Sequence, residues 1–106
     1  MKHILAFVKP NMIEDVIFAL HEIEGMPDAT ICEVKGIGHG AGTERGDVRL
    51  KGVPVSIRLE AVCSDELAPQ IIGTICRKAH TGLPDDGKIY VLPVEEAVCI
   101  CNGEAE

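Results

Sequence analysis

Two cysteines separated by one residue, Cys99 and Cys101, are the side chains of this sequence best suited to metal or redox chemistry. On a β-strand, side chains two positions apart point to the same face, so both sulfurs would reach one metal ion. Thiolates are soft ligands that favour Zn(II) or Cu(I). The alternative interpretation is that both cysteines fill space as small hydrophobic residues. Three others, Cys32, Cys63 and Cys76, lie in apolar patterns and are expected to pack in the core.

Two glycine-containing segments are candidate sites for a ligand or a partner protein. Residues 36–46 hold five glycines in eleven positions, which predicts a flexible loop running to about residue 52. It is not a Walker motif, because no Gly-Lys-Ser/Thr ends it and no helix pattern follows. The second segment is the polar loop over residues 81–87, which leads through Asp86 and Gly87 to Lys88. Glycine there permits close approach of the backbone to a ligand.

Several functional classes are disfavoured by the sequence. It has no Ser/His/Asp signature, no convincing pair of carboxylates and no nucleophile beside a base, so we predict that the protein is not an enzyme. A formal net charge of −7 argues against binding to nucleic acid. No apolar run approaches the ~20 residues of a membrane span, and residues 1–10 do not resemble a signal peptide. We therefore expect a cytoplasmic protein in which the cysteines, five in number, remain thiols.

The 106 residues are expected to form a single domain, residues 1–106, with an aliphatic core, since 46% of them are hydrophobic and only 3% aromatic. One helix pattern runs from Asn11 as N-cap to Gly25 as its stop, and a second from Ser64 as N-cap to Gly82. Pro69 makes the start of the second helix irregular. Strand patterns cover residues 2–8, 29–35, 55–62 and 88–94, with a short fifth strand over 98–101.

The resulting order, β-α-β-β-α-β, is that of an α+β ferredoxin-like fold. It predicts a four-stranded antiparallel sheet with two helices on one face. Because two helices cover only one face, the other face is left bare, which favours oligomerisation. The fold hosts many functions, so function must be inferred from particular residues.

Three stretches together resemble the PII signal-transduction superfamily. Residues 1–10, ending in Lys-Pro, are similar to the opening strand of that family, and residues 33–38 to the strand leading into its long T-loop. Residues 79–95, with Thr-Gly followed by Asp-Gly-Lys-Ile, are similar to its B-loop signature. The Asn-Gly-Glu of residues 102–104 is similar to the Thr-Gly-Glu tail of the family.

The resemblance implies a homotrimer involved in nitrogen regulation, with ligand clefts between neighbouring subunits. Family members bind adenine nucleotides there and use the T-loop to control a target protein, such as a membrane transporter or an enzyme. In this chain it implies a T-loop at about residues 37–53, a B-loop at about 81–88 and a C-terminal segment at 95–106. The nucleotide-binding positions that it implies are Gly36, Ile37, Gly38, His39, Thr81, Gly87 and Lys88.

The sequence also departs from the family pattern. Its T-loop is short and has no tyrosine between residues 36 and 54, which excludes uridylylation there. Arginines that contact phosphate in the family are replaced by His39, Cys99 and Cys101, and a B-loop glycine by Asp85. Since each charge-assisted hydrogen bond to phosphate is worth roughly 1.5–3 kcal/mol, these changes disfavour ATP. They favour a less charged ligand, such as AMP, ADP or a cyclic nucleotide, or no nucleotide.

The leading hypothesis is a regulator in which effector binding shifts the loop over residues 39–52 between disordered and ordered states. A target protein then binds according to the state of this loop. The first alternative is a metal- or redox-responsive sensor that uses Cys99 and Cys101. The resemblance places His39 in the same cleft, as a third ligand for Zn or Cu. The second alternative is a structural trimer without a ligand.

Overall fold

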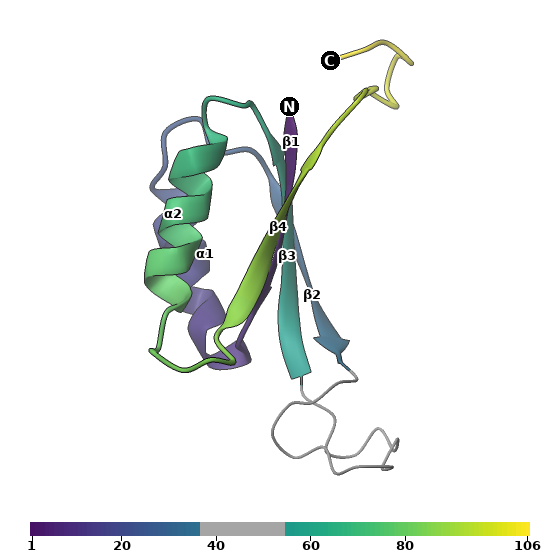
Figure 1. Cartoon of the computed structure of the whole chain (residues 1–106). Coiled ribbons are helices and arrows are strands. Elements are labelled where there is room, and N and C mark those ends of the chain that lie inside the picture. Colours follow the sequence, from purple (N-terminus) through teal and green to yellow (C-terminus); the bar gives the residue numbers. More distant parts are fainter. Residues whose placement is uncertain (37–54) are drawn as a thin grey trace.

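The computed structural model describes residues 1–36 and 55–106 (Figure 1). Its strands and helices follow the predicted order and confirm an α+β ferredoxin-like fold. A short 3-10 helix, η1, precedes the first α-helix. The elements are β1 (Lys2–Val8), η1 (Pro10–Met12), α1 (Ile13–His21), β2 (Ala29–Lys35), β3 (Val55–Cys63), α2 (Ala68–Ala79) and β4 (Gly87–Pro93).

The four strands form one antiparallel sheet in the order β2-β3-β1-β4, and Figure 1 shows both helices on the same face of it. Directly opposed residues of an antiparallel pair share a face, so the register fixes which side chains point to the helices. Ile4 is opposite Ala61, and Ala6 is opposite Leu59. All four of these side chains are buried, which defines the helix-covered face.

The core lies between the sheet and the two helices and is aliphatic, as the composition predicts. α2 contributes its buried stripe of Ile71, Ile75 and Ala79, and α1 contributes Val16 and Leu20. Fully buried aliphatic side chains of this size each stabilise a fold by about 1.5–3 kcal/mol relative to exposure. The residues with side chains almost completely enclosed are Ile4, Val8, Val16, Leu59, Ile71 and Ile75.

The starts of the two helices differ from each other. Asn11 is not an N-cap: it lies inside η1, and Met12 precedes α1 without a side-chain cap. Pro10 fixes the first residue of that 3-10 turn, which moves the helix start beyond Asn11. Ser64 is not the N-cap of the second helix either: Leu67 is at that position without a side-chain cap, and the Leu67 amide donates to the Ser64 Oγ at 3.3 Å within the turn that precedes α2. Pro69 lies in the first turn, where no backbone donor is needed.

The face of the sheet away from the helices carries apolar side chains that remain partly exposed. Val62, Tyr90 and Leu92 are 41–49% exposed there. Tyr90 packs edge-on against Phe7, with ring centroids 6.3 Å apart. Of the cysteines expected in the core, Cys63 is buried, but Cys32 and Cys76 are exposed in the single chain. The apolar residues around Cys32 and Cys76 in the sequence therefore predicted that these two side chains are buried, which they are not in a single chain.

The C-terminal segment does not form a fifth strand. Residues 97–106 fold back on themselves around a single β-bridge between Val98 and Ala105, closed by the Cys99 amide donating to the Glu104 carbonyl at 2.9 Å. This turn lies at the end of the sheet opposite the loop between α2 and β4 (Figure 1). Among the described residues, no helix combines the length and the apolar character needed to cross a membrane.

Candidate ligand site at the loop before the last strand

The loop from Thr81 to Asp86 is closed by a single carboxylate. Asp86 Oδ2 accepts hydrogen bonds from the backbone amides of Thr81, at 2.8 Å, and Gly82, at 3.1 Å. The Thr81 hydroxyl donates to the other oxygen, Oδ1. These bonds hold the pKa of Asp86 well below its usual range, the Thr81 hydroxyl being the largest cause. The sequence therefore builds a rigid anionic turn directly before β4.

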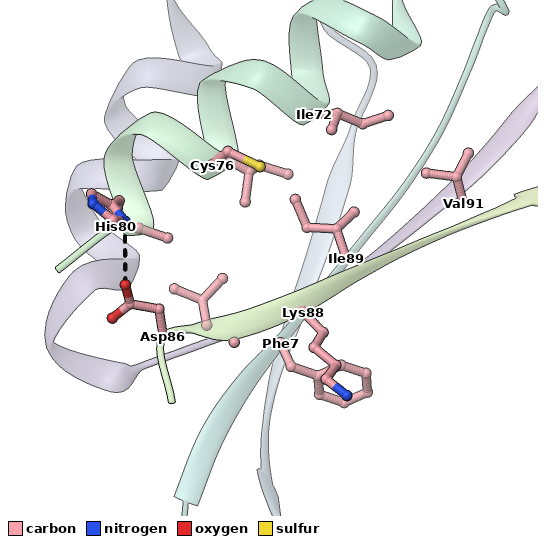
Figure 2. Close-up of a pocket in the computed structure, with 12 residues that line it drawn as sticks. Phe7, Ile72, Cys76, His80, Asp86, Lys88, Ile89 and Val91 are labelled. Carbon is pink, nitrogen blue, oxygen red and sulfur yellow. Dashed lines mark ion pairs between the residues drawn. The ribbon is translucent and has the colours of Figure 1, made fainter. Parts of the chain in front are cut away.

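Lys9, at the end of β1, ties this loop to the sheet. Its Nζ lies 3.0 Å from Asp85 Oδ1, 3.4 Å from Asp86 Oδ1 and 3.4 Å from Thr81 Oγ1. The hydrogen bond to Asp85 is the main reason why the pKa of Lys9 is raised. His80 adds a further contact from the end of α2, with Nδ1 3.4 Å from Asp86 Oδ2 (Figure 2).

Gly87 brings the loop into the sheet, and only glycine fits there. Its φ of +130° is a conformation that other residues rarely adopt, and a Cβ would overlap the Phe7 carbonyl oxygen. The register then places Lys88 opposite Phe7, and Figure 2 shows both side chains on the side of the strands away from α2. The Lys88 ammonium is therefore presented on the open face of the sheet.

A groove of about 450 Å³ lies on the other side of β4, between this strand and α2 (Figure 2). Its floor is apolar, whereas His80 and Asp86 supply polar groups near one end. Mostly apolar clefts with a few polar groups are typical of small-molecule sites. The apolar lining consists of Phe7, Val8, Ile72, Ile75, Cys76, Ala79, Ile89 and Val91.

The structure brings together only part of the predicted nucleotide site. Thr81, Gly87 and Lys88 lie in or next to the same loop. Gly36 follows β2 at the same end of the sheet, but β3 and β1 separate β2 from β4. Three strand spacings amount to about 14 Å, so one chain does not place Gly36 against Gly87. The predicted positions Ile37, Gly38 and His39 lie outside the described residues.

The predicted pair of thiols is not found. Cys99 and Cys101 are bonded to each other in a disulfide, so the expectation of five free cysteines is wrong for these two. Because residues 98–105 form a turn rather than a strand, the cysteine Cα atoms lie 5.3 Å apart, within the usual range for a disulfide. Within residues 1–36 and 55–106, no group of three or more His, Cys, Asp or Glu residues is placed to hold a metal.

Three residues of the loop network were missed as functional candidates by sequence reasoning. Lys9 is distant from the loop in sequence, and His80 lies at the end of α2. Asp86 belongs to the predicted ligand loop, but it was not among the predicted site residues. The available signal was a carboxylate five residues after Thr81 and directly before a glycine. Such a residue can accept hydrogen bonds from the start of its own loop.

Comparison with known proteins identifies the family. The family model described as nitrogen regulatory protein P-II matches residues 1–104. A nitrogen regulatory protein P-II of Azospirillum brasilense is 42% identical over 107 residues, covering 98% of this chain and 95% of the relative. Nitrogen regulatory protein P-II 1 of Escherichia coli (strain K12) is 38% identical, covering 100% of this chain and 96% of the relative.

A more distant relative, nitrogen regulatory protein GlnK2 of Haloferax mediterranei, is 33% identical and covers 98% of this chain and 86% of its own. P-II proteins are regulatory signalling proteins rather than enzymes, which agrees with the absence of a catalytic signature in the sequence. With nearly its whole length matched and its four-stranded fold in place, the chain belongs to the nitrogen regulatory protein P-II family.

Proposed function

We propose that this protein is a cytoplasmic, homotrimeric regulator that binds an adenine nucleotide of low charge, AMP or ADP, between its subunits. Ligand binding changes the T-loop, about residues 37–53, which controls a target protein involved in nitrogen metabolism, such as a membrane transporter or an enzyme. The observation that carries the proposal is the family match over residues 1–104, which includes the B-loop. The domain is a single unit with the T-loop, the B-loop and the C-terminal segment of residues 95–106 as its variable parts.

The separation of the candidate residues supports a site between subunits. Gly36 follows β2 and Gly87 begins β4, the two opposite edge strands of the sheet, and the C-terminal turn with Cys99 lies at the other end of β4. β4 has seven residues, so its two ends lie roughly 20 Å apart. One phosphate group of a nucleotide cannot contact both ends of this strand. A second copy of the chain is therefore needed to enclose a ligand that contacts these parts together.

The charge of the loop supports a ligand with few phosphates. Asp85 and Asp86 lie directly before Gly87, and Lys88 is the cation that follows. Charges a few ångströms apart interact even near a protein surface, by up to about 1 kcal/mol when the side chains are exposed. Each added phosphate therefore meets repulsion from the acidic loop, without the arginines that the family pattern supplies.

Isothermal titration calorimetry of the full chain with adenosine, AMP, ADP and ATP tests this proposal. We expect AMP or ADP to bind at least as tightly as ATP. Lys88→Ala should weaken AMP and ADP binding more than adenosine binding, because it removes the phosphate-binding cation. Lys78→Ala, an exposed lysine on α2, is the charge-matched control and should have no effect. Absence of binding by all four compounds, or a strong preference for ATP, would overturn the proposal.

The T-loop part of the proposal is tested on the target side. A variant in which residues 41–50 are replaced by a short Gly-Ser linker should keep the oligomeric state and lose binding to the target. Candidate targets are purified transporters and enzymes of nitrogen metabolism, measured by surface plasmon resonance with and without AMP or ADP. Unchanged binding of an identified target by the loop variant would exclude the T-loop as the contact.

A second candidate, redox sensing, is favoured by the bond between Cys99 and Cys101. A low-molecular-weight dithiol would reduce the disulfide, giving two protein thiols and one oxidised reagent. Equilibration in thiol–disulfide buffers, read by mass after alkylation, should show a reversible transition that the double change Cys99→Ser, Cys101→Ser abolishes. Zn(II) or Cu(I) uptake, with His39 as a further ligand, would require the reduced pair and is measured after reduction.

A further inference from the structure

The Lys9 ammonium is fully occupied by the chain itself. A lysine ammonium has three N–H donors, and three oxygens surround this one. They are Asp85 Oδ1 at 3.0 Å, Asp86 Oδ1 at 3.4 Å and Thr81 Oγ1 at 3.4 Å. The Lys9 side chain is 20% exposed, so few directions remain open to it. An anionic ligand group that reaches this ammonium must displace one of the three oxygens.

The two carboxylates are held very differently. Asp86 is 19% exposed and is fixed by both backbone amides of the loop, the Thr81 hydroxyl, His80 and Lys9. Asp85 is 68% exposed, and Lys9 is its one ion-pair partner among the described residues. Asp85 can therefore leave by side-chain rotation without disturbing the turn, whereas Asp86 cannot.

We propose that Asp85 is a specificity-determining residue that competes with ligand phosphates for Lys9. This inference rests on the proposed function, because it concerns the same nucleotide site. While its carboxylate pairs with Lys9, the cation at the end of β1 is not available to a phosphate. A ligand phosphate must either displace Asp85 or lie beside it and be repelled. The cost grows with the number of phosphates, so Asp85 lowers the affinity for ATP most, for ADP less and for AMP least.

The size of this effect follows from the exposure of the pair. Ion pairs between exposed side chains contribute up to about 1 kcal/mol, which corresponds to a change in affinity of about fivefold. Removing the Asp85 charge should therefore raise ATP affinity by up to about fivefold and leave adenosine unaffected. The gain should shrink at high salt, because both partners are near the surface.

The test is calorimetric titration of adenosine, AMP, ADP and ATP into the wild type and Asp85→Asn, an isosteric change that removes one negative charge. Glu24→Gln is the charge-matched control, since Glu24 is exposed in the turn at the far end of α1. We expect ATP and ADP to gain affinity in Asp85→Asn only. In the double variant Lys9→Gln, Asp85→Asn, the gain should disappear, because the ammonium itself is gone.

The outcomes separate this inference from the proposed function. Adenosine or AMP binding with no gain for ATP in Asp85→Asn would overturn the inference and leave the proposed function standing. A gain that persists without Lys9, or that Glu24→Gln reproduces, would also overturn it, since general repulsion would then suffice. No binding of any compound by any variant would overturn both. Asp85→Ser provides a second test if asparagine disturbs the loop, which the amide spectrum of Thr81 would reveal.

Discussion

Asp86 gives the loop of residues 81–86 its shape because one carboxylate satisfies two backbone amides and a hydroxyl at once. An asparagine in its place offers one carbonyl oxygen and no charge, so part of this set is lost. Its neighbour Asp85, which shares the same residue type, lacks these bonds and lies out in solvent. Within two adjacent positions, the chain therefore separates an acid that shapes the loop from an exposed acid whose ion pair with Lys9 can open.

The ionisation of Asp86 should be visible in how the stability of the protein depends on pH. Its pKa is lowered in the folded state, mainly by the Thr81 hydroxyl, so it stabilises the fold above the unfolded carboxyl value of about 3.9. That contribution is lost as pH falls below this value. Asp86→Asn should lower the melting temperature at pH 7, and the difference from wild type should shrink between about pH 4 and pH 2.5. Thermal unfolding followed by circular dichroism measures this, with Asp28→Asn as control; a pH-independent difference would contradict it.

Gly87 provides a second prediction. In Gly87→Ala, the new Cβ would collide with the Phe7 carbonyl oxygen, and the positive φ would be strained. Since such strain costs about 1–3 kcal/mol by itself, we expect a loss of at least that size in the free energy of unfolding. Urea denaturation measures it. Gly73→Ala, a helix position with open space around it, should be neutral or stabilising, and equal losses in both variants would refute the steric explanation.

Among the elements, α2 depends on a turn that precedes it. The Leu67 amide donates to both oxygens of Ser64, the side-chain Oγ at 3.3 Å and the backbone carbonyl at 3.2 Å. Ser64→Ala removes only the first of these bonds. We therefore expect a loss of about 0.5–1 kcal/mol in unfolding free energy, in the lower part of the range for capping residues. Ser64→Thr should retain most of the stability, and urea denaturation of all three proteins distinguishes the outcomes.

The strands were predictable because their patterns are local. β1 and β2 have the bounds expected from sequence, and β3 and β4 differ by one residue at their ends. The helix ends were less predictable. Ile23 continues the apolar spacing of α1, but it lies buried in the turn after the helix. A turn that packs on the core also needs apolar side chains, so the spacing alone did not show where the helix ends. Pro10 and its 3-10 turn shifted the other end of this helix.

The candidate site was predictable only where sequence neighbours form it. Thr81 and Gly87 belong to one loop and could be chosen from the pattern of that loop. Lys9 is 72 positions from Thr81, and their contact depends on β1 pairing with β4. For Cys99 and Cys101, spacing alone does not distinguish a strand from a turn, and the turn allowed the two sulfurs to bond to each other.

At the scale of the whole molecule, the open face of the sheet predicts association. Val62, Tyr90 and Leu92 stay partly exposed on it, and the family resemblance leads us to expect a trimer. Light scattering coupled to size exclusion should give three times the chain mass of 11.4 kDa. Tyr90→Glu places a charge among these apolar side chains and should shift the mass towards one chain. Glu96→Lys, outside the sheet, is the control; a wild-type monomer would rule out the trimer.

Because β4 is an edge strand of the sheet, it affects how the protein behaves on dilution. β1 is its one paired neighbour among the described strands, so its other side offers free amide and carbonyl groups. β2, the opposite edge strand, carries the charged residues Glu33 and Lys35, which disfavour pairing with strands of other chains. After Lys88, β4 has no charged side chain. Wild-type chains separated from their copies should therefore tend to aggregate through this edge, whereas the charge that Tyr90→Glu adds to β4 should keep separated chains of that variant in solution.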